Sequence, residues 1–175
     1  CLVGSEMCIR DRVYDIELKQ SLAGIGVRAH YSDGTHAEFQ YVIPSGHTED
    51  WNHFLFTFDG ALAKDGSGNI TTSANGKLYV NGTEYENYAS SSTIGSGVSK
   101  TAGDMRVPAK LYLGAGNLKA YFDNVAIWDK YLTAAEASEA YNGGYYMDIT
   151  EHSRASTYLV SHYTFDDGSD STSTN

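Results

Sequence analysis

The Asn81-Gly82 pair constrains the fold of this chain more than any other short feature of the sequence. It separates two short runs, LYV (78–80) and TEY (83–85). The two central residues of a type I′ hairpin turn need positive φ, which Asn and Gly adopt at low cost. We therefore expect a β-hairpin over residues 76–85, and a chain built largely from antiparallel strands.

Strand periodicity extends to both sides of this hairpin. Segments 14–20, 24–31 and 36–43 show an alternation typical of strands, and Asp33-Gly34 favours a turn, so we expect a meander of three strands. Both faces of segment 51–60 are largely apolar, which predicts a central strand. The small, polar stretches 61–76 and 89–109 predict loops. Further strands are expected at 110–114, 119–129 and 157–165.

One helix follows this β-rich pattern. Thr133 and Glu136 have the spacing of a capping box, residues 134–141 favour a helix, and Gly143 can adopt the positive φ that ends one. Ala137 and Tyr141 lie one turn apart, so we expect both to pack against the sheet. The predicted fold class is all-β, an antiparallel sandwich with one short C-terminal helix.

The net charge and the hydropathy of the sequence argue against two classes of partner, nucleic acids and membranes. The formal net charge is -10, and no basic patch stands out that could neutralise a phosphate backbone, so we expect no nucleic-acid partner. A membrane helix needs about 20 apolar residues, and no run approaches that length. We therefore expect no membrane insertion.

Four motifs in sequence order resemble the concanavalin A-like, laminin G-like jelly-roll modules. They are WNHFLFTFDG, GKLYVNG, LYLGAG and YFDNVAIWDKYLTAAEASEAYNGG, and the resemblance covers residues 14–144. It implies an antiparallel jelly roll. The opening strand typical of the family is missing before Val13, but a similar string, LVSHYTFDDGSDSTS, occurs at 159–173.

This displaced motif predicts the domain organisation. We expect residues 13–144 to form a sandwich without its opening strand, and 145–175 to be a linker and the opening strand of a following module in a tandem array. Within that segment, 157–165 should fold back and pair beside the strand of Asp123. Leu159 or Val160 would then be buried.

The first twelve residues, CLVGSEMCIRDR, differ from all that follow. They hold both cysteines and resemble the conceptual translation of a sequencing adapter found in environmental assemblies. We therefore expect residues 1–12 to be non-native and to make no integral contact with the sandwich; the alternative is a real N-terminal strand. Without them the chain has no cysteine, and cysteine usage does not fix its redox compartment.

The sequence contains no recognisable catalytic motif and offers two candidate metal ligands. The acidic string Glu-Xaa-Asp-Xaa-Xaa-Glu of the related β-glucanases does not occur, so we expect no catalytic residue and no enzyme. The resemblance implies one structural calcium in an intact module, with Asp123 and Asp59 as candidate ligands. Because Ca²⁺ takes about six to eight oxygens, the alternatives stay open: Asp123 as a cap for local backbone N–H groups, and Asp59 as a turn residue.

Sugar binding commonly uses exposed aromatic rings with amide groups nearby. The candidate ligand-binding residues are Tyr85, Tyr88, Asn81, Asn87, Tyr145 and Tyr146. The alternative for each tyrosine is a place in the core.

The resemblance implies a non-catalytic recognition or adhesion module that binds a glycan or a surface protein on the outside of a cell or virion. The alternatives are a structural spacer repeat without a ligand, and an accessory module of a secreted glycoside hydrolase. Clustered exposed aromatic residues would favour recognition over a spacer.

Overall fold

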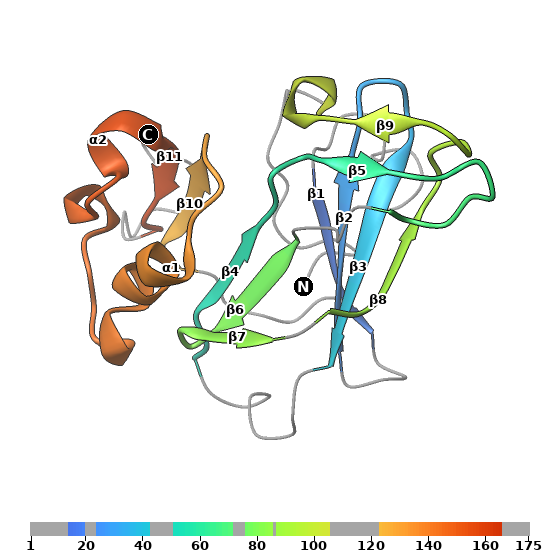
Figure 1. Ribbon diagram of the computed structural model, residues 1–175. Coiled ribbons are helices and arrows are strands. Elements are labelled where there is room, and N and C mark those ends of the chain that lie inside the picture. Colours follow the sequence, from blue (N-terminus) through green and yellow to red (C-terminus); the bar gives the residue numbers. More distant parts are fainter. Residues whose placement is uncertain are drawn as a thin grey trace.

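The computed structural model describes residues 14–19, 24–42, 51–71, 76–85, 87–105 and 123–165 (Figure 1). For residues 14–19, 24–25 and 87–90 the description covers the backbone alone. The strands are β1 (Tyr14–Lys19), β2 (Gly24–His30), β3 (His36–Val42), β4 (Phe54–Thr57), β5 (Leu62–Ala63), β6 (Lys77–Val80), β7 (Thr83–Tyr85), β8 (Asn87–Ser92), β9 (Ser99–Lys100), β10 (Val125–Trp128) and β11 (Leu159–Tyr163). The helices are α1 (Ala134–Tyr141), the single turn α2 (Ala155–Tyr158), and the 3-10 segments η2 (Ala102–Asp104), η3 (Asn142–Gly144) and η4 (Ile149–Glu151).

The expected meander forms one side of an antiparallel sandwich. Strands β1, β2 and β3 pair in sequence order, and β8 adds to the free edge of β3. Gly34 adopts φ +87 in the turn between β2 and β3. Along β3, Ala37, Phe39 and Tyr41 are buried and their neighbours are more exposed, as the period of two residues in a strand requires.

The predicted hairpin is confirmed. Strands β6 and β7 pair around Asn81 and Gly82, whose φ values of 51 and 74 are both positive, as a type I′ turn requires. Strand β4 pairs with the other edge of β6. Among the described strands β4 has this single neighbour, so its central position stays a prediction.

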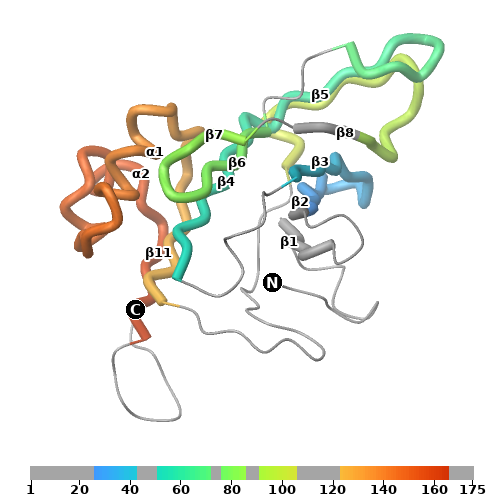
Figure 2. Tube along the Cα trace, turned by 90° about the horizontal axis from the view of Figure 1, so that it is seen from below, coloured from blue at the N-terminus to red at the C-terminus, as the bar shows by residue number. Residues whose placement is uncertain are grey.

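Both faces of the β4–β6–β7 sheet contact apolar residues, which makes it a middle layer. Leu78 and Val80 of β6 enter a cluster with the buried side chains of β2 and β3, whereas Tyr79 enters a second cluster with Leu132 and Ala137. Figures 1 and 2 show the resulting order: the four-stranded sheet, the β4–β6–β7 sheet, and the unit that contains α1. The middle position of this sheet explains why both faces of segment 51–60 are apolar: Leu55 contacts the second cluster and Phe56 contacts the first.

The C-terminal unit begins as expected with a capped helix. Thr133 accepts a hydrogen bond from the backbone N–H of Glu136, and the Glu136 side chain accepts one from the backbone N–H of Thr133. The helix ends at Asn142, which adopts φ 49 one residue before Gly143. Ala137 is fully buried, as predicted.

Segment 159–163 pairs antiparallel with β10, the pairing that its pattern predicts. The expected burial of Leu159 or Val160 is wrong: Leu159 is half-buried against the second cluster, and Val160 is exposed, because among the described strands β11 lies at the edge of a two-stranded sheet. The expected strand starts two residues late, because 155–158 form the turn α2. Whether β11 opens a following module stays a prediction.

Two expected loops contain regular structure. The stretch 61–76 includes β5, and 89–109 includes most of β8, together with β9 and η2. These strands have no apolar pattern that would predict them, because β8 is rich in serine and β5 and β9 have two residues each. Backbone pairing defines them instead. Residues 1–12, the strand at 110–114 and the start of 119–129 lie outside the described residues.

Candidate recognition surface

Exposed aromatic side chains gather at one end of the molecule. Trp51 and Phe54 at the start of β4 are 71% and 47% exposed, and Tyr145 and Tyr146 after α1 are 79% and 71% exposed. The start of β4, the β6–β7 turn and the end of α1 lie together at the lower left of Figure 1. Phe54 pairs with Val80 and shares its face of β4 with Phe56, which packs against the first cluster, so it faces away from α1. We call the other three side chains, Trp51, Tyr145 and Tyr146, the aromatic corner.

Asn81 ties the hairpin turn to the segment that carries Trp51. Its side-chain oxygen accepts a hydrogen bond from the backbone N–H of His53 (2.9 Å), and its amide nitrogen donates to the side-chain oxygen of Asn52 (2.9 Å). The backbone N–H of Asn81 donates to the carbonyl of His53 (3.0 Å). Both polar atoms of the Asn81 amide therefore form hydrogen bonds within the fold.

Tyr141 joins this turn to the end of α1. A Cβ added at Gly82 would lie 2.7 Å from Cδ1 of Tyr141, so the ring packs directly on the glycine backbone. The rings of Tyr141 and His53 are 5.9 Å apart, and the Tyr141 hydroxyl lies close to Gly144. Glycine at position 82 thus permits both the turn and the close approach of the helix.

The imidazole of His53 is a neutral part of this framework. Burial lowers its pKa below 6.5, because the charged form loses hydration inside the protein. In the part of the chain that the structure describes, Nδ1 of His53 is buried and has no hydrogen-bond partner. His53 therefore supplies no positive charge to the corner at neutral pH.

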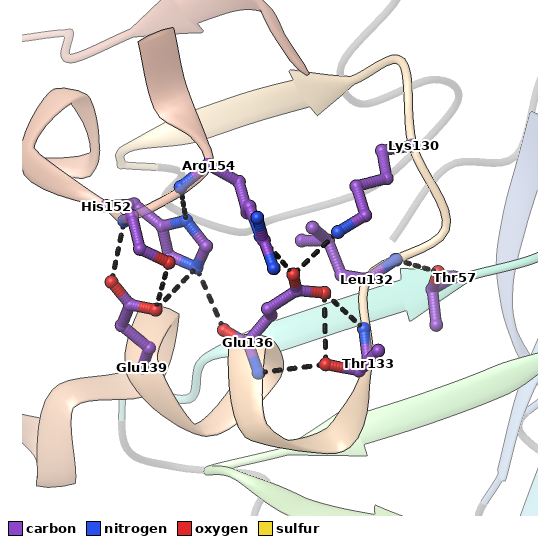
Figure 3. A network of polar contacts seen from close by, with 9 residues as sticks. Thr57, Lys130, Leu132, Thr133, Glu136, Glu139, His152 and Arg154 are labelled. Carbon is purple, nitrogen blue, oxygen red and sulfur yellow. Dashed lines mark hydrogen bonds and ion pairs between the residues drawn. The ribbon is translucent and has the colours of Figure 1, made fainter. Parts of the chain in front are cut away.

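The buried carboxylate of Glu136 organises the helix that supports the corner (Figure 3). It accepts hydrogen bonds from Lys130 Nζ (2.6 Å), from Nε of Arg154, and from the backbone N–H and hydroxyl of Thr133. Burial raises the pKa of Glu136, but the bonds from Lys130, Thr133 and Arg154 outweigh that effect and lower it from 4.5 to about 2. The group is ionised at neutral pH and fixes both cations.

A second set of bonds holds the far end of the segment that contains Tyr145 and Tyr146. His152 Nδ1 accepts the backbone N–H of Arg154, so Nε2 carries the proton and donates to the carbonyl of Glu136 (3.0 Å). Glu139 accepts hydrogen bonds from the backbone N–H and hydroxyl of Ser153. The loop 142–151 is thus anchored to α1 at both ends.

The two halves of the corner share one rigid support. The backbone N–H of Leu132, just before α1, donates to the hydroxyl of Thr57 at the end of β4 (2.8 Å). Leu132, Leu55 and Ala140 also belong to the second apolar cluster. Strand β4, which leads away from Trp51, and the helix that leads to Tyr145 are therefore held together by buried contacts.

The residues predicted to bind a ligand differ in their exposure to solvent. Tyr145 and Tyr146 are exposed, whereas Tyr85 is half-buried against the first cluster. Asn87 and Tyr88 lie in β8, and their side chains are outside the described part. Trp51 was missed as a ligand candidate, since alternation assigned it, with His53 and Leu55, to one face of a central strand.

The candidate metal ligands show no cluster. Asp59 accepts the backbone N–H of Ala61 through its side chain, which is the geometry of a turn residue, and Asp123 is exposed. Among the described residues, no group of three or more His, Cys, Asp or Glu side chains is arranged to hold a metal ion.

Comparison with known proteins identifies the class to which this fold belongs. The family described as the concanavalin A-like lectin/glucanases superfamily matches residues 12–138. The chain belongs to this family, and the predicted laminin G-like jelly roll is confirmed. Neither a curated protein nor a solved structure gives a significant match.

Family membership supports a lectin-like or adhesion module in general, since laminin G-like domains often bind glycans or proteins and are commonly extracellular. In the part of the chain that the structure describes, no helix is both long and apolar enough to span a membrane.

Proposed function

We propose that this chain is a non-catalytic, extracellular recognition module that binds carbohydrate through the aromatic corner. The observation that carries the proposal is the exposure of three large aromatic side chains, Trp51, Tyr145 and Tyr146, from two segments that meet at Asn81 and Tyr141. Aromatic faces contact the apolar face of a sugar ring and lose little side-chain entropy when they do so. A spacer without a ligand gives no reason to expose them together.

The support beneath these rings fits a binding role. Free side-chain motion would have to be frozen on binding, and a preorganised site avoids part of that cost. The hydrogen bonds of Asn81 fix the backbone next to Trp51, and the contacts of Glu136 and His152 fix the segment that follows Tyr146. The corner therefore presents its rings on a framework that is already ordered.

A glycan array followed by calorimetry on the whole chain tests the proposal. Binding should be weak, independent of catalysis, and reduced about tenfold by Trp51→Ala or Tyr145→Ala, because removing a central aromatic contact costs about 1–2 kcal/mol. Phe165→Ala serves as the control, since Phe165 is an exposed aromatic residue that stacks on Tyr163 outside the corner. Flat titrations across plant, algal and bacterial polysaccharides would refute the proposal and favour the spacer.

A further inference from the structure

The positive charges of the described surface are already paired. Six lysine and arginine side chains have a described placement, and each bonds within the protein. Five bond to carboxylates, and Lys64 donates to the backbone carbonyls of Ser92 and Ile94. The carboxylate pairs are Arg28–Glu38, Lys77–Glu84, Lys100–Asp33, Lys130–Glu136 and Arg154–Glu136.

The described cations on the hairpin and around α1 are neutralised in this way. Lys77 lies on the hairpin and pairs with Glu84, and Lys130 and Arg154 share the carboxylate of Glu136. The remaining charges of the supporting framework are carboxylates such as Glu139, which Ser153 already binds. In the sequence, Glu49-Asp50 directly precedes Trp51, and the net charge of the chain is -10.

We infer that the aromatic corner selects uncharged glycan chains and rejects polyanionic ones. This inference rests on the proposed function of the corner. A sulfate or uronate group placed there would lose hydration and meet no unpaired cation among the described side chains, while the acidic protein repels it. A neutral pyranose needs only an apolar ring face and hydroxyl partners, so its binding does not depend on a counter-charge.

Calorimetry with two groups of probes separates the outcomes. The neutral probes are oligosaccharides of β-glucan, mannan and xylan, and the anionic probes are alginate and heparin oligosaccharides of matched length. We expect at least one neutral probe to bind with an affinity that changes less than about twofold between low and high salt, and anionic probes to bind at least about tenfold more weakly. An anionic probe that binds as tightly would overturn the inference and leave the proposed function standing. No binding in either group would instead refute the proposed function.

Added charge provides a matched test of the same idea. Thr83 is exposed on β7 next to Gly82, whereas Ser67 is exposed in the turn that follows β5, away from the corner. Thr83→Lys should raise the affinity for anionic probes several-fold at low salt, and Ser67→Lys should not, although both add one positive charge. Equal gains in the two variants would show that net charge and not the corner controls selection, which would also overturn the inference.

Discussion

Replacing Glu136 by glutamine keeps the size of the side chain and removes the charge that Lys130 and Arg154 share. The carboxylate accepts four hydrogen bonds, and an amide has one oxygen with which to replace them. Hydrogen bonds to charged groups contribute about 1.5–3 kcal/mol each, and the half-exposed Arg154 contributes at the low end. We expect Glu136→Gln to lower the free energy of unfolding by about 2–3 kcal/mol at pH 7.

The measurement is thermal unfolding as a function of pH. For a domain of this size, about 2–3 kcal/mol corresponds to a fall in Tm of about 4–12 °C. The folded pKa of Glu136 lies below its value of 4.5 in an unfolded chain, at about 2. Its contribution is therefore complete above about pH 4.5 and is lost as the pH falls toward 2. The difference between wild type and variant should shrink over that window.

Glu151→Gln is the matched control, because Glu151 is exposed in η4 on the same segment and its substitution should change stability by less than about 0.5 kcal/mol. Two results would refute the reasoning. One is a Glu136→Gln variant as stable as wild type at pH 7. The other is a stability difference that stays the same at pH 7 and pH 2.5.

Three further substitutions test the local structure, each by chemical denaturation. Thr133→Ala should cost about 1 kcal/mol through loss of the helix cap, and an unchanged midpoint would contradict the capping geometry. Gly82→Ala should lower the free energy of unfolding more than Gly34→Ala. Both positions have positive φ, but only a Cβ at position 82 would lie 2.7 Å from Tyr141, whereas nothing lies within 4 Å of a Cβ at position 34. Equal losses of stability would show that Tyr141 moves away freely. Leu132→Ala should cost about 2.7–5 kcal/mol, because the side chain is 1% exposed in the second cluster, and a loss below about 1 kcal/mol would contradict that packing.

The sequence alone was enough wherever the chemistry is local. Asn81-Gly82 specified the hairpin because those two residues tolerate positive φ, and Thr133 with Glu136 specified the start of α1 because the cap lies within one helical turn. The meander followed from a period of two residues. Strand β8 was missed because its serines show no period of two residues. Its place in the sheet comes from backbone pairing with β3.

The candidate site depended on contacts between distant segments. Tyr85 and Tyr145 have the same chemistry, and only packing makes one half-buried and the other exposed. Asn81 carries an amide suited to a sugar, yet residues 52–53, almost thirty positions away in the chain, use it for the fold. Trp51 became a candidate because the turn and α1 bring the start of β4 beside the end of the helix. Such neighbours are set by the tertiary fold, since burial and hydrogen-bond partners between remote residues leave no periodic pattern in the sequence.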